Sequence, residues 1–156
     1  VEPHIWNSCK NASVIADNIY SALCAIDSTR RDVFKIRLDS LKQSIAQTDS
    51  TIRTLLKNAN RTFLIYHPAL SYFAQEYGLK QISIEDDGKE PSPAQLKNLI
   101  DTCRKENANV IFIQKEFDMH NTLLIASELG VSVVLINPLN YDWQNEMIHI
   151  ARSLTK

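Results

Sequence analysis

The chain has 156 residues, of which 44% are hydrophobic and 22% are charged, a composition typical of a globular protein with one sizeable domain. Its formal net charge is -1, from 17 basic and 18 acidic residues, so we expect no nucleic-acid partner. No apolar run approaches the roughly 20 residues that a transmembrane helix needs.

The first segment places a histidine among apolar residues. His4 stands in the sequence Pro-His-Ile-Trp, and its neighbours Ile5 and Trp6 indicate that it is held in a packed structure. The chain begins at Val1 with no initiator Met and no signal peptide, and we therefore expect it to be a fragment of a longer protein.

Two helices are predicted next. Residues 11–26 carry apolar side chains at helical spacing, with Asn11 as the expected cap. Residues 29–58 form the longest periodic segment, without Gly or Pro, and predict one helix of roughly 45 Å at 1.5 Å per residue. A helix of this length either forms a coiled coil or runs along a body wider than one small lobe.

From residue 62 onward, short runs rich in β-branched and aromatic residues alternate with helical stretches. This alternation predicts an α/β fold in which a four-stranded parallel sheet carries helices on both faces. Gly78 and Gly130 are expected as left-handed helix ends, and Ser92-Pro93 as a helix start. The order of the strands cannot be read from the sequence. The expected strands are 62–66, 81–85, 109–114 and 132–136, and the expected helices are about 69–77, 93–106, 120–129 and 142–154.

Polar residues follow every predicted strand. Because ligands of open parallel sheets bind beyond the carboxyl ends of the strands, these residues are the candidates for a site. They include one histidine and several oxygen-bearing side chains, a combination that suits a divalent cation. They are His67, the run from Glu85 to Glu90, the segment 114–116, and Asn137.

Each of these candidates also has an ordinary structural reading. A lone histidine at a strand end, such as His67, is often a hydrogen-bonded structural residue, and the acidic run from Glu85 is typical of a solvated loop. His120 and His149 fall in helical stretches and are expected at the surface or in packing. The three cysteines show no CxxC spacing, so a thiolate metal site is not expected.

Motifs for nucleophilic catalysis and nucleotide binding are missing from the sequence. There is no GxSxG elbow and no Walker A motif, and the chain holds only three glycines. One enzymatic alternative remains, a metal-dependent hydrolase that uses His67 and the carboxylates of residues 85–90.

Five stretches together carry a family resemblance. The chain resembles the solute-binding proteins of ABC transporters for zinc and manganese, a family that includes adhesin-like lipoproteins. The resemblance covers almost the whole chain, in the family's order. The stretches are PHIWNSCKNASVIADNIYSAL, FLIYHPALSYFAQEYGL, IEDDGKEPSPAQLKNLI, NVIFIQKEF and VVLINPLNYDW.

The resemblance implies two α/β lobes joined by one long rigid helix, with the metal between the lobes. Residues 1–27 would then be the tail of the N-terminal lobe, residues 28–58 the interlobe helix, and residues 59–156 the C-terminal α/β lobe. The rest of the N-terminal lobe, with the family's first histidine ligand, would lie outside this chain.

The resemblance also implies a set of metal ligands. His4 matches the second ligand of the family and His67 the third; a histidine at the third position is zinc-like, whereas manganese-selective members usually carry Glu there. We therefore expect Zn²⁺, with Mn²⁺ as the alternative. Asn137 stands where the family often has an Asp ligand, so the fourth ligand is Asn137, a water molecule, or a nearby carboxylate such as Glu85.

The function implied by the resemblance is capture of the metal and its delivery to the permease of an ABC importer, without catalysis. The expected location is the periplasm or the outer face of the cytoplasmic membrane, with a lipid anchor preceding residue 1 as an option. A binding or interaction module of the same fold that holds no metal is the alternative. Without the other lobe, the chain is expected to expose apolar surface and to self-associate.

Overall fold

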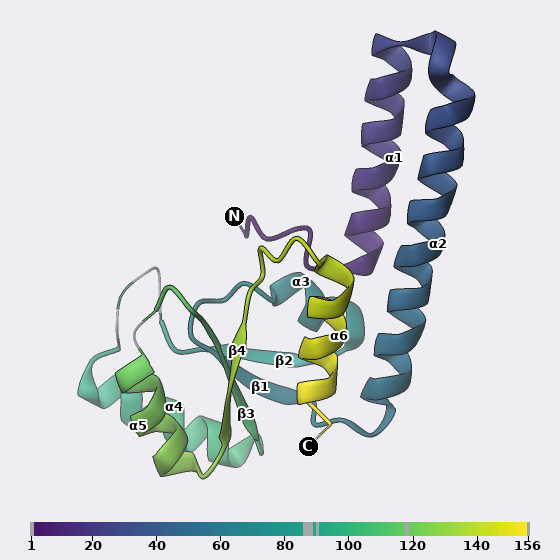
Figure 1. Cartoon of the computed structure of the whole chain (residues 1–156). Helices are drawn as coiled ribbons and strands as arrows, with labels where there is room; N and C mark the ends of the chain where they lie inside the picture. Colours follow the sequence, from purple (N-terminus) through teal and green to yellow (C-terminus); the bar gives the residue numbers. More distant parts are fainter. Residues whose placement is uncertain (1, 86–88, 90, 118, 156) are drawn as a thin grey trace.

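The computed structural model describes residues 2–85, 89, 91–117 and 119–155, and it combines a helical hairpin with an α/β lobe. In Figure 1, the hairpin of α1 and α2 stands up from one side of the lobe. The helices are α1 (Cys9–Ile26), α2 (Arg31–Leu55), α3 (Ser71–Tyr77), α4 (Pro93–Lys105), α5 (Met119–Leu129) and α6 (Trp143–Ser153). The strands are β1 (Thr62–Ile65), β2 (Lys80–Ser83), β3 (Val110–Gln114) and β4 (Ser132–Ile136).

The first helix begins earlier than its periodicity predicts. The Ser8 side chain accepts a hydrogen bond from the Asn11 backbone N–H at 3.0 Å, so Ser8 is the cap and the helix starts at Cys9. The prediction that Asn11 caps this helix is therefore wrong. A serine three residues before the donor satisfies one of the free N–H groups of the first turn, which leaves Asn11 inside the helix.

The predicted long helix is confirmed, and a 3₁₀ turn, which is wound more tightly than an α-helix, adjoins each of its ends. α2 spans 25 residues, with short 3₁₀ turns at Ser28–Arg30 and Leu56–Asn58 on either side. Its second half packs against the lobe, where Gln144 of α6 donates to the Ser44 carbonyl at 3.1 Å and Ile52 is fully buried. Its first half lies beside α1, and Leu41, which belongs to the periodic apolar stripe, remains 49% exposed there.

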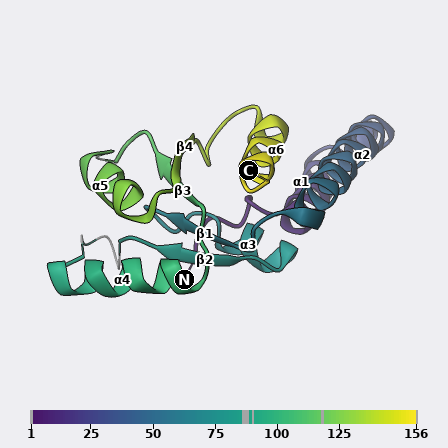
Figure 2. The same cartoon turned by 90° about the horizontal axis from the view of Figure 1, so that it is seen from below.

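The sheet is parallel throughout, with the strand order β2-β1-β3-β4. All residues of β1 and β3 are buried, as expected for central strands covered on both faces. Figure 2 shows α4 and α5 on one side of the sheet and α3 and α6 on the other. The prediction of a four-stranded parallel sheet with helices on both faces is thus confirmed.

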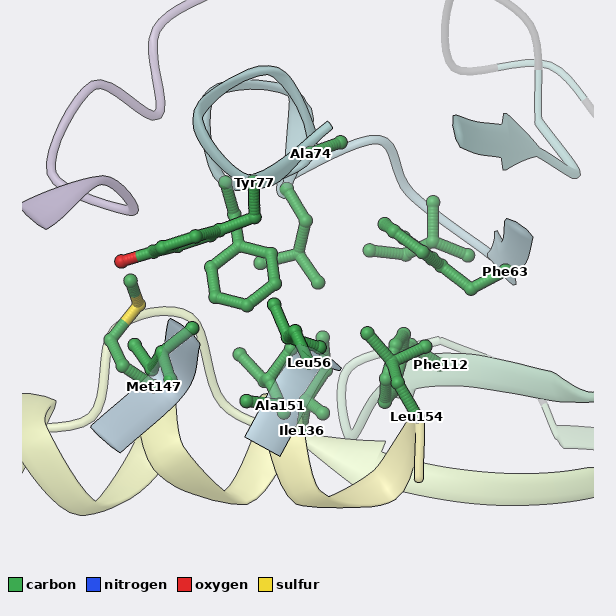
Figure 3. Packing of buried hydrophobic residues seen from close by; sticks show 14 of the residues in the cluster. Leu56, Phe63, Ala74, Tyr77, Phe112, Ile136, Met147, Ala151 and Leu154 are labelled. Carbon is green, nitrogen blue, oxygen red and sulfur yellow. The ribbon is translucent and has the colours of Figure 1, made fainter. Parts of the chain in front are cut away.

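Alternate side chains of the central strands pack into two separate hydrophobic cores, one on each face of the sheet. Phe63 and Phe112 point toward α2, α3 and α6, where their rings meet edge to face at 5.3 Å. Figure 3 shows this core, with Tyr77 of α3 on one side and Met147 of α6 on the other. Leu64, Ile111 and their neighbours form the second core under α4 and α5. The two-residue period of the strands thus fixes which helix each side chain meets.

The predicted helix ends are confirmed. Gly78 and Gly130 adopt φ angles of 66° and 67°, in the left-handed region that favours glycine at a helix C-terminus. Ser92 and Gln95 form a capping box at the start of α4, with Pro93 in its first turn. These local signals set where α3 and α5 end and where α4 begins.

Two further features of the described residues bear on the class of protein. None of their helices combines the length and the apolar character required to cross a membrane. Cys9, Cys24 and Cys103 are buried free thiols. Burial raises the pKa of the Cys103 thiol to about 11, so this side chain behaves as a small apolar residue.

Candidate metal centre

The strand order places a site between β1 and β3. From β1 the chain passes to β2 on one side of β1, and later enters β3 on the other side, so the connections diverge there. Ligands of such sheets bind at this point, outside the carboxyl ends of the strands. His67 follows β1 at this point, and Gln114 ends β3.

A pocket of about 250 Å³ occupies this position. It brings together five of the residues predicted from the sequence, which come from four distant parts of the chain: His4, His67, Gln114, Glu116 and Asn137. The remaining lining residues are Trp6, Ala69, Phe117, Pro138 and Leu139.

Several side-chain hydrogen bonds hold the N-terminal segment on the lobe. The Trp6 indole N–H donates to the Pro138 carbonyl at 2.8 Å, and the Trp143 indole N–H donates to the Trp6 carbonyl at 2.9 Å. The buried Asn7 amide donates to the Ala69 carbonyl at 2.9 Å. His4 is therefore fixed across the carboxyl edge of the sheet, although it stands near the start of the chain.

The two histidines lie side by side in the pocket. Their ring centroids are 5.2 Å apart and the ring planes are inclined by 76°. Phe117 stacks on the His67 ring with the centroids 5.6 Å apart, and the Gln114 amide donates to the His67 carbonyl at 3.0 Å. Two imidazoles in such proximity are suitable ligands for one zinc ion.

A carboxylate contacts the Nδ1 atom of each histidine. The distance from His67 Nδ1 to Glu85 Oε1 is 2.5 Å, and His4 Nδ1 pairs in the same way with Glu2 Oε1. Burial by itself would raise the pKa of Glu2, but its hydrogen bonds with His4 and Ser71 lower it overall. Glu85, considered from the sequence as a metal ligand, is not among the residues that line the pocket; it contacts His67 from outside.

The side chain of Asn137 holds the loop that follows β4. Its Oδ1 atom accepts a hydrogen bond from the Leu139 backbone N–H at 3.2 Å, which closes a turn after β4. Its own backbone N–H donates to Glu146 at 2.8 Å. Asn137 thus lines the pocket while its amide oxygen, the atom expected to bind metal, also holds the loop.

The donor set within this chain corresponds to part of a zinc site. In the part of the chain that the structure describes, no three His, Cys, Asp or Glu side chains are grouped so as to hold a metal ion. Zinc in a closed protein site takes four ligands, usually imidazole, thiolate or carboxylate groups. His4 and His67 fit two of these positions, and the others require groups beyond these two histidines.

The last candidates named from the sequence are His149, His120 and the acidic loop that follows Glu85. His149 is exposed on α6 and lies 3.2 Å from the Leu135 carbonyl through its Nε2 atom, as expected for a surface residue. The acidic residues 86, 87 and 90 and the side chain of His120 lie outside the described part of the chain. No carboxylate of that loop except Glu85 can therefore be placed relative to the pocket.

Sequence reasoning did not identify Glu2, Trp6 or Phe117 as part of the site. For Glu2 there was a signal, because an acidic residue two positions before a candidate ligand can reach the ring of that ligand. For Phe117 there was none, since an aromatic residue in a loop after a strand has no fixed direction. Only the packing of the loop against β1 brings Phe117 onto the His67 ring.

Comparisons with known proteins agree with this geometry. The family model described as the zinc-uptake complex component A, periplasmic, matches residues 1–156. The high-affinity zinc uptake system protein ZnuA of Bacillus subtilis is 28% identical over 142 residues, which cover 89% of this chain and 44% of that protein.

Two solved structures are also similar. A crystal structure of ZnuA superposes with a TM-score of 0.94 at 32% identity, over 99% of this chain and 61% of the other. The laminin-binding protein of Streptococcus agalactiae, described as having adhesin and metal-transporting activity, gives a TM-score of 0.87 at 27% identity, over 99% of this chain and 65% of the other.

The chain thus spans between 44% and 65% of the length of these three relatives. The family is one of solute-binding transport proteins and not of enzymes, which removes the hydrolase alternative. Because the family model matches the chain from its first residue to its last, the protein belongs to the periplasmic zinc-uptake component A family.

Proposed function

We propose that this chain is the part of a zinc-capture protein that supplies two of the metal ligands, His4 and His67. The observation that carries the proposal is the convergence of these two rings, 5.2 Å apart, in a pocket at the divergence of the sheet connections. The N-terminal hydrogen bonds of Trp6 and Asn7 support it, because they hold His4 in place across the carboxyl edge of the sheet.

The ligand chemistry favours zinc over manganese. Both candidate ligands are imidazoles, which suit zinc, whereas manganese prefers carboxylate and other oxygen ligands. The Glu85 carboxylate contacts the Nδ1 atom of His67 and is not among the residues that line the pocket. The ligands that complete the site are Asn137 or a water molecule and groups from the remainder of the protein.

The whole protein delivers the metal to the permease of an ABC importer at the outer face of the cytoplasmic membrane. This part of the proposal rests on the family, whose description names a zinc-uptake complex and the periplasm. A lipid anchor preceding residue 1 remains part of the proposal. No catalytic step is needed, because capture and release change only the ligands of the ion.

Three segments have separate roles in this proposal. Residues 1–27 belong with an N-terminal lobe, residues 28–58 link the lobes, and residues 59–156 form the C-terminal lobe. Exposed apolar side chains on the hairpin support the presence of a further lobe that covers them in the whole protein. Without that lobe we expect this chain to self-associate, and a monomeric mass in solution would refute this expectation. The exposed side chains are Val14, Ile19, Leu23, Ile26, Val33, Ile36 and Leu41.

A zinc titration by calorimetry, with manganese as competitor, tests the proposed function. We expect this chain to bind one zinc ion, more weakly than a complete four-ligand site would, and to retain it in the presence of excess manganese. The same titration on the full-length protein is the control for ligands outside this chain. Failure of both proteins to bind zinc would favour the alternative of a module that holds no metal.

Asn137→Asp is expected to tighten zinc binding by about tenfold or more. The change places a full negative charge at the pocket, and a unit charge pair 4 Å apart gains about 4 kcal/mol at an effective dielectric constant of 20, part of which desolvation cancels. Calorimetry on both proteins measures the difference. Asn98→Asp, which adds the same charge on the exposed face of α4, is the matched control. Equal affinity of Asn137→Asp and the unchanged chain would place Asn137 away from the metal.

A further inference from the structure

Both pocket histidines are bonded through the same ring nitrogen. Glu85 meets Nδ1 of His67 at 2.5 Å, and Glu2 meets Nδ1 of His4. The two carboxylates come from unrelated parts of the chain, one after β2 and the other from the N-terminal segment. The contact of Glu85 with His67 joins residues 18 positions apart, whereas Glu2 stands two positions before His4, yet both carboxylates meet the same ring nitrogen.

An ionised carboxylate can only accept hydrogen bonds, so the ring nitrogen that faces it must carry the proton. In a neutral imidazole this leaves the lone pair on Nε2, which is the form that binds a metal. A carboxylate on the second nitrogen also fixes the orientation of a metal-binding ring and raises its basicity. Glu85 and Glu2 are placed to do both for His67 and His4.

The burial of Glu85 also indicates that its carboxylate is held against His67. Its side chain is only 8% exposed, and its backbone N–H donates to the Tyr66 carbonyl at 3.2 Å, in line with the β1–β2 pairing. A buried carboxylate is costly unless it is paired and hydrogen-bonded. The partner that the structure gives it is His67, and no basic side chain of Lys or Arg is recorded against it among the described residues.

We propose that Glu85 and Glu2 are positioning residues, which hold His67 and His4 in the Nδ1–H tautomer and present Nε2 to the metal. The metal itself rests on the function proposed above, whereas the tautomer does not, because it depends only on contacts within this chain. The chain also contains a natural contrast. His149 faces the Leu135 carbonyl with Nε2, and since a carbonyl only accepts, that ring carries its proton on Nε2.

Nitrogen-15 spectra of the imidazole rings in the metal-free chain, in alkaline buffer, test the tautomers. We expect Nδ1–H for His67 and His4 and Nε2–H for His149. In Glu85→Gln the amide can either donate or accept, and in Glu85→Ala no partner remains, so both variants are expected to give mixed tautomers at His67 alone. Glu2→Gln should do the same at His4. An Nε2–H tautomer at His67 in the unchanged chain, or an unaltered tautomer in both Glu85 variants, would overturn the proposal.

Zinc titration of the same proteins separates this proposal from the proposed function. Loss of a carboxylate behind a metal-binding histidine typically costs 10- to 100-fold in affinity, and we expect a loss in this range for Glu85→Gln. Glu106→Gln, which removes the partner of an exposed ion pair with Lys80, is the matched control and should leave the affinity unchanged. Equal zinc affinity of Glu85→Gln and the unchanged chain would refute the role of Glu85. Absence of zinc binding in both the unchanged chain and the full-length protein would instead count against the proposed function, and the tautomer result would then decide this proposal.

Discussion

Replacing His67 by alanine is expected to weaken zinc binding by about 100-fold. Structural zinc sites with four ligands have apparent binding free energies of roughly 10–16 kcal/mol. One ligand in four therefore contributes about 3 kcal/mol, which corresponds to about 100-fold in affinity. His67 lies at the carboxyl end of β1, with Phe117 stacked on its ring and Glu85 at its Nδ1 atom. Calorimetry with the unchanged chain and the variant measures the loss.

His149→Ala is the matched control for this variant. It removes the same side chain from an exposed position on α6, where the ring lies 3.2 Å from the Leu135 carbonyl through its Nε2 atom. We expect unchanged zinc affinity. If His67→Ala bound zinc as tightly as His149→Ala, the ion would not be held at this pocket, and the proposal of His67 as a ligand would fail.

Replacing Phe112 by alanine is expected to lower the free energy of unfolding by about 3–5 kcal/mol, the usual cost of removing a fully buried phenylalanine. Phe112 has no exposed surface, and its ring meets Phe63 edge to face between the sheet and the helices α2, α3 and α6. The loss is a large part of the 5–15 kcal/mol that stabilises a typical domain. Urea unfolding followed by circular dichroism measures it.

Phe34→Ala provides the comparison for this core variant. Phe34 is half-buried on the first half of α2, with the Arg30 guanidinium 5.4 Å from its ring centroid. Its loss removes an exposed cation–π contact and little packing, so we expect a change of about 1 kcal/mol or less. Equal destabilisation by both variants would mean that the sheet core does not dominate the stability of this chain.

The sequence by itself determined the elements of the fold and the edge that carries the site. The two-residue and 3.6-residue periods are local properties of the chain, so the alternation of strands and helices after residue 62 could be read directly. Helix ends were equally local, as at Gly78, where a left-handed residue is required. The position of His67 and Asn137 at the carboxyl edge followed from parallel strands alone, before any strand order was known.

The tertiary structure decided which of these residues meet. The order β2-β1-β3-β4 depends on pairing between segments far apart in the chain, and such pairing leaves no period in the sequence. His4 reaches His67 because long-range contacts hold the N-terminal segment on the lobe, among them the hydrogen bond from Trp6 to the Pro138 carbonyl across 132 positions. Glu85 could be identified as a nearby carboxylate, but whether it lies inside the pocket or behind His67 depends on which way its side chain packs. Periodicity records which face of an element is buried, whereas the partner of each polar atom is set by long-range packing, which places Glu85 at Nδ1 of His67 and the Asn137 oxygen on the Leu139 N–H.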